Sequence, residues 1–295
     1  MFTIIIPTYG RPDNLQRAIN SVLNQTYKNF DLIVVDDNDS ESENYKLTEA
    51  VISNFIDSDI KFLRHGKNHN GSTARNTGLN ACNSDFVIFL DDDDELLPNF
   101  LSEIERFILE KKALFIYVLA EWKIKNRSVG VSSFKESGNI LVDVLAVNTD
   151  MNTSCLCIDT QLIKSLGGFN ESLKRHQDIE MIARVNEKQD IDVLPSVLVC
   201  RHLDSEINQP LFSIFRDNKI NFFKILSPIL DKLSLEQKKI IYRAHAFQLW
   251  AYALKSFEFF YVIRHLGVIF KSRTLYRKFY RKTIRFIKKG LARWL

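Results

Sequence analysis

The sequence of 295 residues lacks the features of several protein classes. Its cysteines form no CxxC pair, and we expect four reduced thiols rather than disulfides or zinc ligands: Cys82, Cys155, Cys157 and Cys200. No uncharged apolar run reaches the ~18 residues that a transmembrane helix needs. The chain opens directly on a strand-like segment, Phe2–Pro7, so we expect no secretory leader. These absences predict a cytoplasmic protein with a substantial core.

Acidic residues are missing from the end of the chain. Residues 264–295 contain eleven Lys or Arg and no Asp or Glu, whereas the rest carries 29 basic and 36 acidic residues. Phe279, Phe286 and Trp294 recur among the basic residues at helical spacing, which predicts an amphipathic helix that binds an anionic membrane from the inner, cytoplasmic side. A helical cap whose basic face is solvated is the alternative. Nucleic acid is not an expected partner, because the acidic body repels phosphate.

Short β-rich runs alternate with amphipathic helical patterns over the first 200 residues. This alternation predicts an α/β fold with a mostly parallel sheet and helices on both faces. Residues 121–152 show no regular pattern and receive no assignment. We expect strands at Phe2–Pro7, Asp31–Val35, Ile60–Arg64, Phe86–Leu90, Phe115–Leu119, Thr153–Ile158 and Ile191–Val199.

The pattern changes near residue 205, after which only helical spacing remains. We therefore predict two domains, an α/β domain at residues 1–205 and a helical, basic, membrane-associating region at residues 206–295.

Four consecutive carboxylates, Asp91–Asp94, follow the apolar run Val87–Leu90. Such crowding raises the pKa values of like charges unless a cation lies among them. Oxygen ligands suit Mg²⁺ or Mn²⁺, and the carboxyl ends of strands are where open α/β sheets bind ligands. The alternative is an acidic helix start that favours the helix dipole.

Two other polar loops follow predicted strands. Pro7, Thr8 and Tyr9 follow the first strand, and Asp36 and Asp37 follow the second. Each of these two loops could contact a nucleotide or could be an ordinary turn.

Two further candidate residues lie at the starts of predicted helices. Arg75 could bind a diphosphate or form a surface ion pair, and Asp178 could be a general base or a helix cap.

Together these segments resemble the family 2 glycosyltransferases with the GT-A fold, over residues 2–205. The fragments that carry the resemblance, in the family's order, are Ile6–Tyr9, Ser21–Thr26, Val34–Asn38, Ala74–Gly78, Phe89–Asp94, Gly167–Glu171 and Gln177-Asp178.

The resemblance implies an inverting, metal-dependent hexosyltransferase that uses Mn²⁺ or Mg²⁺. It places Pro7, Thr8, Tyr9, Asp36, Asp37, Arg75 and Asp92 at the donor nucleotide. Asp91 and Asp93 match the DxD metal motif, with His202 as a further metal ligand or a structural histidine. Asp178 matches the catalytic base. Many members have Glu where this chain has Gln177, which leaves the acceptor preference open.

The expected donor is a nucleotide-diphosphate sugar, with UDP as the nucleotide. The expected acceptor is a lipid-linked saccharide of cell-surface polysaccharide synthesis, such as lipopolysaccharide or capsule. A non-catalytic nucleotide-sugar-binding or scaffold protein of the same fold is the alternative.

Overall fold

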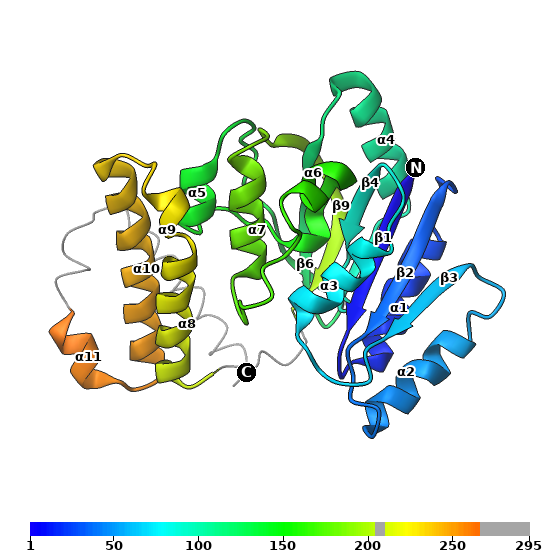
Figure 1. Ribbon diagram of the computed structural model, residues 1–295, viewed down its shortest axis with the longest axis horizontal. Coiled ribbons are helices and arrows are strands. Elements are labelled where there is room, and N and C mark those ends of the chain that lie inside the picture. Colours follow the sequence, from blue (N-terminus) through cyan, green and yellow to red (C-terminus); the bar gives the residue numbers. More distant parts are fainter. Residues whose placement is uncertain (204–209, 266–295) are drawn as a thin grey trace. The chain divides into compact units, whose positions relative to one another are not determined.

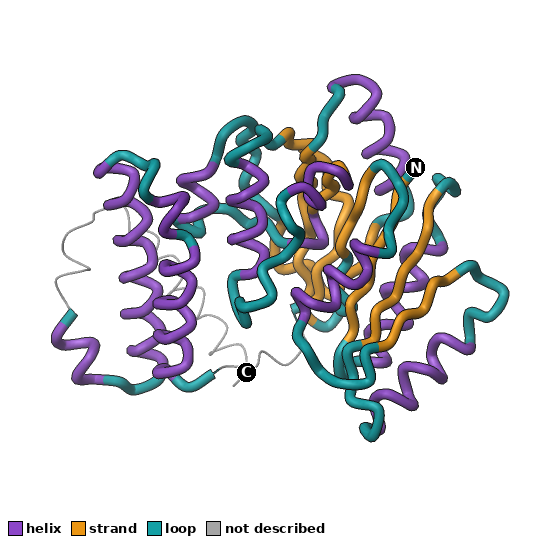
Figure 2. The backbone as a smooth tube through the Cα atoms, viewed as in Figure 1, coloured by secondary structure: helices purple, strands orange, loops and turns teal. Residues whose placement is uncertain are grey.

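The computed structural model describes residues 1–203 and 210–265 of the chain, which divides into two compact units, Met1–Ile207 and Asn208–Leu295. The first unit is built on one sheet, shown in Figures 1 and 2. Within the described residues this sheet has nine strands in the order β3-β2-β1-β4-β8-β6-β9-β5, with β7 paired to β6. The strands are β1 Phe2–Thr8, β2 Phe30–Asp36, β3 Ile60–Arg64, β4 Phe86–Phe89, β5 Asp94–Leu96, β6 Phe115–Ile124, β7 Arg127–Val131, β8 Leu156–Asp159 and β9 Asp192–His202.

The sheet is mixed. Strands β3, β2, β1 and β4 are parallel neighbours, and so are β6 and β9, while β8, β5 and β7 each pair antiparallel. The alternating β-α pattern therefore predicted the parallel half. The antiparallel strands are short or lie in the stretch that we left unassigned.

Helices connect and cover these strands. They are α1 Pro12–Leu23, α2 Glu43–Ser53, α3 Gly71–Asn80, α4 Phe100–Lys111, α5 Leu141–Leu145, α6 Thr160–Ser165 and α7 Gln177–Asn186. The central strand β1 is buried from Phe2 to Ile6, as expected for a strand covered on both faces. Helix α3 approaches β1 so closely that a Cβ atom at Gly78 would lie 2.4 Å from Ile5 Cγ2. Glycine at this position allows the helix to pack directly on the strand.

The second unit is helical. It contains α8 Phe212–Ile225, α9 Ser227–Leu230, α10 Leu235–Lys255 and α11 Phe259–Arg264. Its core includes Phe212, Trp250 and Val262, and the indole of Trp250 donates a hydrogen bond to the carbonyl of Val262 at 3.1 Å. The predicted amphipathic helix near the end of the chain lies outside the described residues.

Candidate active site

The predicted site loops meet at the carboxyl ends of β1, β2 and β4. Parallel pairing brings Thr8 beside Asp36, and it brings Ile5 beside Phe89, the last residue of β4. Backbone hydrogen bonds then join the loops, from Asp37 N to Thr8 O at 3.0 Å and from Leu90 N to Ile5 O at 2.9 Å. Segments that are about 30 and 80 residues apart in sequence therefore form one edge of the sheet.

The four consecutive carboxylates have two different environments. The side chains of Asp91 and Asp93 are 29% and 18% exposed, whereas those of Asp92 and Asp94 are almost completely buried. Carboxylate oxygens of Asp91, Asp93 and Asp94 lie within 4.8 Å of one another. Three hard oxygen donors at this spacing fit a divalent cation such as Mg²⁺ or Mn²⁺.

Asp92 joins the run to the first loop. Its carboxylate accepts a hydrogen bond from Thr8 Oγ1 at 2.9 Å and lies 3.3 Å from Arg11 Nε. Burial raises the pKa of Asp92 to about 7, although Arg11 opposes the shift. Arg11 also forms an ion pair with Asp93, so one guanidinium links both carboxylates to the loop after β1.

Asp94 faces the opposite side, toward a short 3-10 helix at Thr153–Cys155. Its carboxylate accepts hydrogen bonds from Ser154 Oγ at 2.6 Å and Asn152 Nδ2 at 3.2 Å. Burial, reinforced by the charge of Asp91, raises the pKa of Asp94 to about 7.

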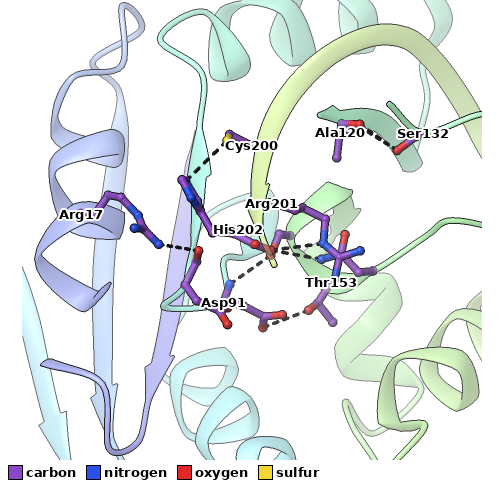
Figure 3. A network of polar contacts seen from close by, with 12 residues as sticks. Arg17, Asp91, Ala120, Ser132, Thr153, Cys200, Arg201 and His202 are labelled. Atoms are coloured by element: carbon purple, nitrogen blue, oxygen red, sulfur yellow. Dashed lines mark hydrogen bonds and ion pairs between the residues drawn. The ribbon is translucent and has the colours of Figure 1, made fainter. Parts of the chain in front are cut away.

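The same short helix contacts Asp91. The Asp91 N–H donates to Ser154 Oγ at 3.2 Å, and Thr153 Oγ1 donates to the Asp91 carboxylate at 3.2 Å (Figure 3). The predicted strand at Thr153–Ile158 was therefore wrong over its first three residues, because strand β8 begins only at Leu156. The 3-10 turn directs two consecutive hydroxyl side chains at the acidic run.

Arg75 connects the acidic run to the start of α7. Its Nη2 lies 2.6 Å from Asp91 Oδ1, and its Nη1 donates to Gln177 Oε1 at 3.2 Å. Burial acts to raise the pKa of Asp91, but Arg75, with help from Arg201 and the Thr153 hydroxyl, lowers that pKa overall. Arg75, the predicted diphosphate contact, thus lies between the acidic run and the start of α7, where the predicted base Asp178 is found.

Asp178 lies in the first turn of α7, and the residue before this helix, His176, has a left-handed backbone with φ 61°. Burial raises the pKa of Asp178, and the Ile179 backbone N–H and Arg75 partly oppose the shift. A partly buried carboxylate with a raised pKa suits a proton acceptor, although the N–H contact also fits a helix cap.

The loop before α7 is fixed by α3. Asn76 Nδ2 donates to Phe169 O at 2.9 Å, and Phe169 N donates to Asn76 Oδ1 at 2.8 Å. Phe169 also packs edge-on against Phe89 at 4.9 Å between ring centroids. Two predicted motifs, Ala74–Gly78 and Gly167–Glu171, therefore bind each other and orient the segment that leads to Asp178.

The predicted nucleotide residues differ in accessibility. Tyr9 is 51% exposed, whereas Asp36 and Asp37 are buried and already hydrogen-bonded. Asp36 accepts from the backbone and side chain of Asn38. Asp37 accepts hydrogen bonds from four groups between residues 65 and 70: His65 Nδ1, Asn68 Nδ2, His69 N and Asn70 N.

His202 does not belong to the group formed by the carboxylates of Asp91, Asp93 and Asp94. Its side chain lies on β9 with Cys200, and its Nε2 contacts Glu95 of the neighbouring strand β5. Glu95, Cys200 and His202 form a second group of possible metal donors. The nearby Arg17 donates to the carbonyl of Asp93 at 2.9 Å and so connects this group to the acidic run.

Sequence reasoning missed Arg11, Asn152, Thr153 and Ser154 as site residues. The signal for the last three was a polar run immediately before the buried segment Leu156–Ile158. Only the tertiary structure reveals that these side chains reach the acidic run from about 60 residues away.

Comparison with known proteins identifies the family of this chain. The sequence model of the family described as "Glycosyl transferase family 2" matches residues 3–156, more than half of the chain. An Escherichia coli beta-1,3-glucosyltransferase, WfgD, is 28% identical over 200 residues, which cover 68% of this chain and 75% of the relative. A Campylobacter jejuni beta-1,3-glucosyltransferase is 37% identical over 105 residues, but the match spans only 35% of this chain and 32% of that protein.

The solved structures extend the comparison to nearly the whole chain. Staphylococcus aureus TarS 1–349 in complex with UDP-GlcNAc superposes with a TM-score of 0.60 at 19% identity, covering 96% of this chain and 92% of that chain. At this identity the similarity concerns the fold, which is the GT-A arrangement expected from the motifs. The family match, the order of the motifs and the shared fold agree, and the chain belongs to glycosyl transferase family 2.

Proposed function

We propose that this glycosyltransferase moves a sugar from a UDP-sugar to a hydroxyl of a lipid-linked saccharide, with inversion at the anomeric carbon. The observation that carries the proposal is the contact chain Asp91–Arg75–Gln177, and it supports a shared site because Gln177 directly precedes the base candidate Asp178. Among the relatives, WfgD is a UDP-Glc:alpha-D-GlcNAc-diphosphoundecaprenol glucosyltransferase, and the acceptor of the Campylobacter protein is also linked to undecaprenol by a diphosphate. The acceptor proposed for this chain follows theirs.

In this proposal Asp91 and Asp93 hold a divalent cation. Bound there, Mn²⁺ or Mg²⁺ would stabilise the leaving diphosphate as a Lewis acid. The raised pKa of Asp94 and its hydrogen bonds to Ser154 and Asn152 suit a positioning role, which keeps Asp91 and Asp93 oriented.

The base is Asp178. Its carboxylate takes the proton of the acceptor hydroxyl as that oxygen attacks the anomeric carbon, and the bond to the nucleoside diphosphate breaks on the opposite face. One displacement assisted by one base inverts the configuration. Arg75 orients the site by pairing with Asp91 and Gln177, and its charge lies close to the diphosphate position.

Thr8 and Tyr9 are proposed nucleotide contacts in the loop after β1. The proposed role of Asp36, Asp37 and Asp92 is to hold the loops of the nucleotide site in place. Their carboxylate oxygens already accept hydrogen bonds from those loops.

The second unit is proposed to contact an anionic membrane on its cytoplasmic face. Phe257, Phe259, Phe260 and Ile263, at and beside α11, are between 59% and 78% exposed, while Val262 anchors this helix in the core. The basic residues 264–295 follow directly in sequence. Within the described parts of the chain, no helix is both long and apolar enough to cross a bilayer.

A screen of UDP-sugars with Mn²⁺ tests this function. UDP release that depends on a saccharide-diphosphate-lipid acceptor is the expected result. A non-catalytic nucleotide-sugar-binding protein would bind UDP-sugar with Mn²⁺ and release no UDP with any acceptor.

A further inference from the structure

Arg201 is a cation of the site whose guanidinium forms an ion pair with Asp94, but whose buried Nε–H donates no hydrogen bond to a described residue. Its nearest carboxylate is Asp94, at 3.7 Å from Nε, and within residues 1–203 and 210–265 Nε has no hydrogen-bond acceptor. Three other arginines near the carboxyl ends of the strands, Arg11, Arg64 and Arg75, each donate a hydrogen bond to a carboxylate. A guanidinium has five N–H donors, and leaving a buried one, here the Nε–H, without an acceptor is costly.

Arg201 borders the acidic run. The carboxylate beside it, Asp94, lies within 4.8 Å of Asp91 and Asp93, and Arg201 belongs to the network of polar contacts drawn in Figure 3. The side chain is 29% exposed, so part of it remains accessible from solvent although Nε is shielded.

Two more polar atoms near Arg201 lack partners among the described residues. Trp122 is the register partner of Arg201 in the parallel pair β6–β9, so both side chains extend from the same face of the sheet. The indole Nε1 of Trp122 is buried and has no acceptor among the described residues. Asn152 donates to the same Asp94 oxygen that lies nearest Arg201, and its Oδ1 is buried without a donor. Buried polar atoms normally find partners, so these three indicate a ligand.

We propose that Arg201, Trp122 and Asn152 form a subsite for a saccharide acceptor that carries a phosphate group. Arg201 pairs with the phosphate oxygens, and Trp122 and Asn152 contact the adjoining sugar through the indole N–H, the ring and the amide oxygen. The acceptor identity rests on the proposed function, whereas the phosphate chemistry follows from a guanidinium that forms a long ion pair with Asp94 and leaves its Nε–H without an acceptor among the described residues.

A diphosphate could come from the donor or from the acceptor, and the position of the subsite favours the acceptor. The proposed nucleotide loops follow β1 and β2, whereas Arg201 and Trp122 lie on β9 and β6, beyond β4 and β8 in the sheet. On the donor side, Arg11 and Arg75 donate hydrogen bonds to carboxylates of the acidic run, whereas Arg201 forms only the longer ion pair with Asp94. Arg201 is therefore the cation available to a second, acceptor-borne phosphate.

Binding measurements with two probes test this subsite without requiring turnover. One probe is N-acetylglucosamine α-1-diphosphate with a short alkyl chain, and the other is the α-glycoside of the same sugar and chain without phosphate. With UDP and Mn²⁺ present, we expect the protein to bind the diphosphate probe at least about tenfold more tightly, the typical gain of a charge-assisted hydrogen bond.

Three variants separate the contributions. Arg201→Met should abolish this preference while leaving Mn²⁺-dependent UDP binding within about twofold. Arg201→Lys should keep part of the preference, because lysine supplies charge without the planar fork. Trp122→Phe should weaken both probes alike and preserve their ratio. Arg127→Met removes an exposed arginine of β7 and is the matched control, with no expected change.

Several results would overturn the subsite. Equal binding of both probes by the unaltered protein excludes a phosphate site. If Arg201→Met weakens UDP binding as much as the diphosphate probe, Arg201 serves the donor. If Arg201→Met does not fold, Arg201→Lys and Trp122→Phe decide the matter, and an unchanged probe ratio in Arg201→Lys together with unchanged affinities in Trp122→Phe rejects the proposal. A protein that shows the preference but transfers no sugar keeps the subsite and loses the proposed function.

Discussion

Replacing Asp178 with Asn separates the two roles that this residue could have. The amide keeps the size of the side chain and an oxygen that accepts the backbone N–H of Ile179, but it cannot take a proton at neutral pH. We expect kcat to fall by about 10²–10⁴, the usual contribution of a positioned general base, with UDP-sugar binding nearly unchanged.

The pH dependence sharpens this prediction. Burial raises the pKa of Asp178 above its ordinary value of about 4. A base acts in its deprotonated form, so kcat/KM of the unaltered enzyme should rise with pH as the pH passes through that raised pKa. The Asp178→Asn variant should lack this rise and retain only the pH dependence of other groups.

A matched control exists in α1, where Asp13 also lies in the first turn of a helix but is exposed. Removing either negative charge should cost about 0.3–1 kcal/mol of stability through the helix dipole. Urea unfolding measures that effect, and acceptor-dependent UDP release measures turnover. Near-normal turnover by Asp178→Asn, or an equal loss in Asp13→Asn, would show that Asp178 is only a cap.

Three further changes have defined outcomes. Asp93→Ala should abolish Mn²⁺-stimulated UDP release while the far-ultraviolet circular dichroism stays unchanged, and persistent Mn²⁺ stimulation would reject the DxD assignment. Gly78→Ala should lower the free energy of unfolding in urea by about 1–3 kcal/mol, because the new methyl group meets Ile5 at 2.4 Å; an unchanged midpoint would mean that α3 can move away from β1. Deleting residues 271–295 should release the protein from anionic vesicles in sedimentation assays while transfer to a short soluble acceptor survives; continued vesicle binding would place the membrane contact elsewhere.

Local signals predicted the parallel half of the sheet well. The run Ile4–Ile6 is apolar, β-branched and followed by a polar loop, so both its strand and its place at the site could be inferred from a few residues. The acidic run gave a similar signal, because four carboxylates after a buried strand are difficult to explain without a cation.

Contacts set by distant pairing could not be predicted in this way. The hairpin β6–β7 lies partly in residues 121–152, whose pattern is irregular, and its register contains a bulge between Trp122 and Lys123. The three-residue strand β5 could not be recognised from the sequence, because two of its residues, Asp94 and Glu95, are acidic and atypical of a strand. The neighbours of Arg201 depend on how β9 pairs with β6, which no local pattern specifies.

Hydrogen bonds between the loops of the site also explain why the role of single residues was difficult to predict from the sequence. Asp37 matches a nucleotide motif, yet its oxygens accept hydrogen bonds from the loop between β3 and α3. A motif identifies which residues belong to a site. Only the hydrogen-bond partners indicate which of them face a ligand and which support the loops.

The configuration of the transferred sugar tests the central claim most directly. Proton NMR of the product formed from an α-linked UDP-sugar and a saccharide-diphosphate-lipid acceptor gives the anomeric coupling constant. The single displacement assisted by Asp178 predicts a β-linked product. An α-linked product, or tight UDP-sugar binding with no product from any acceptor, would contradict it.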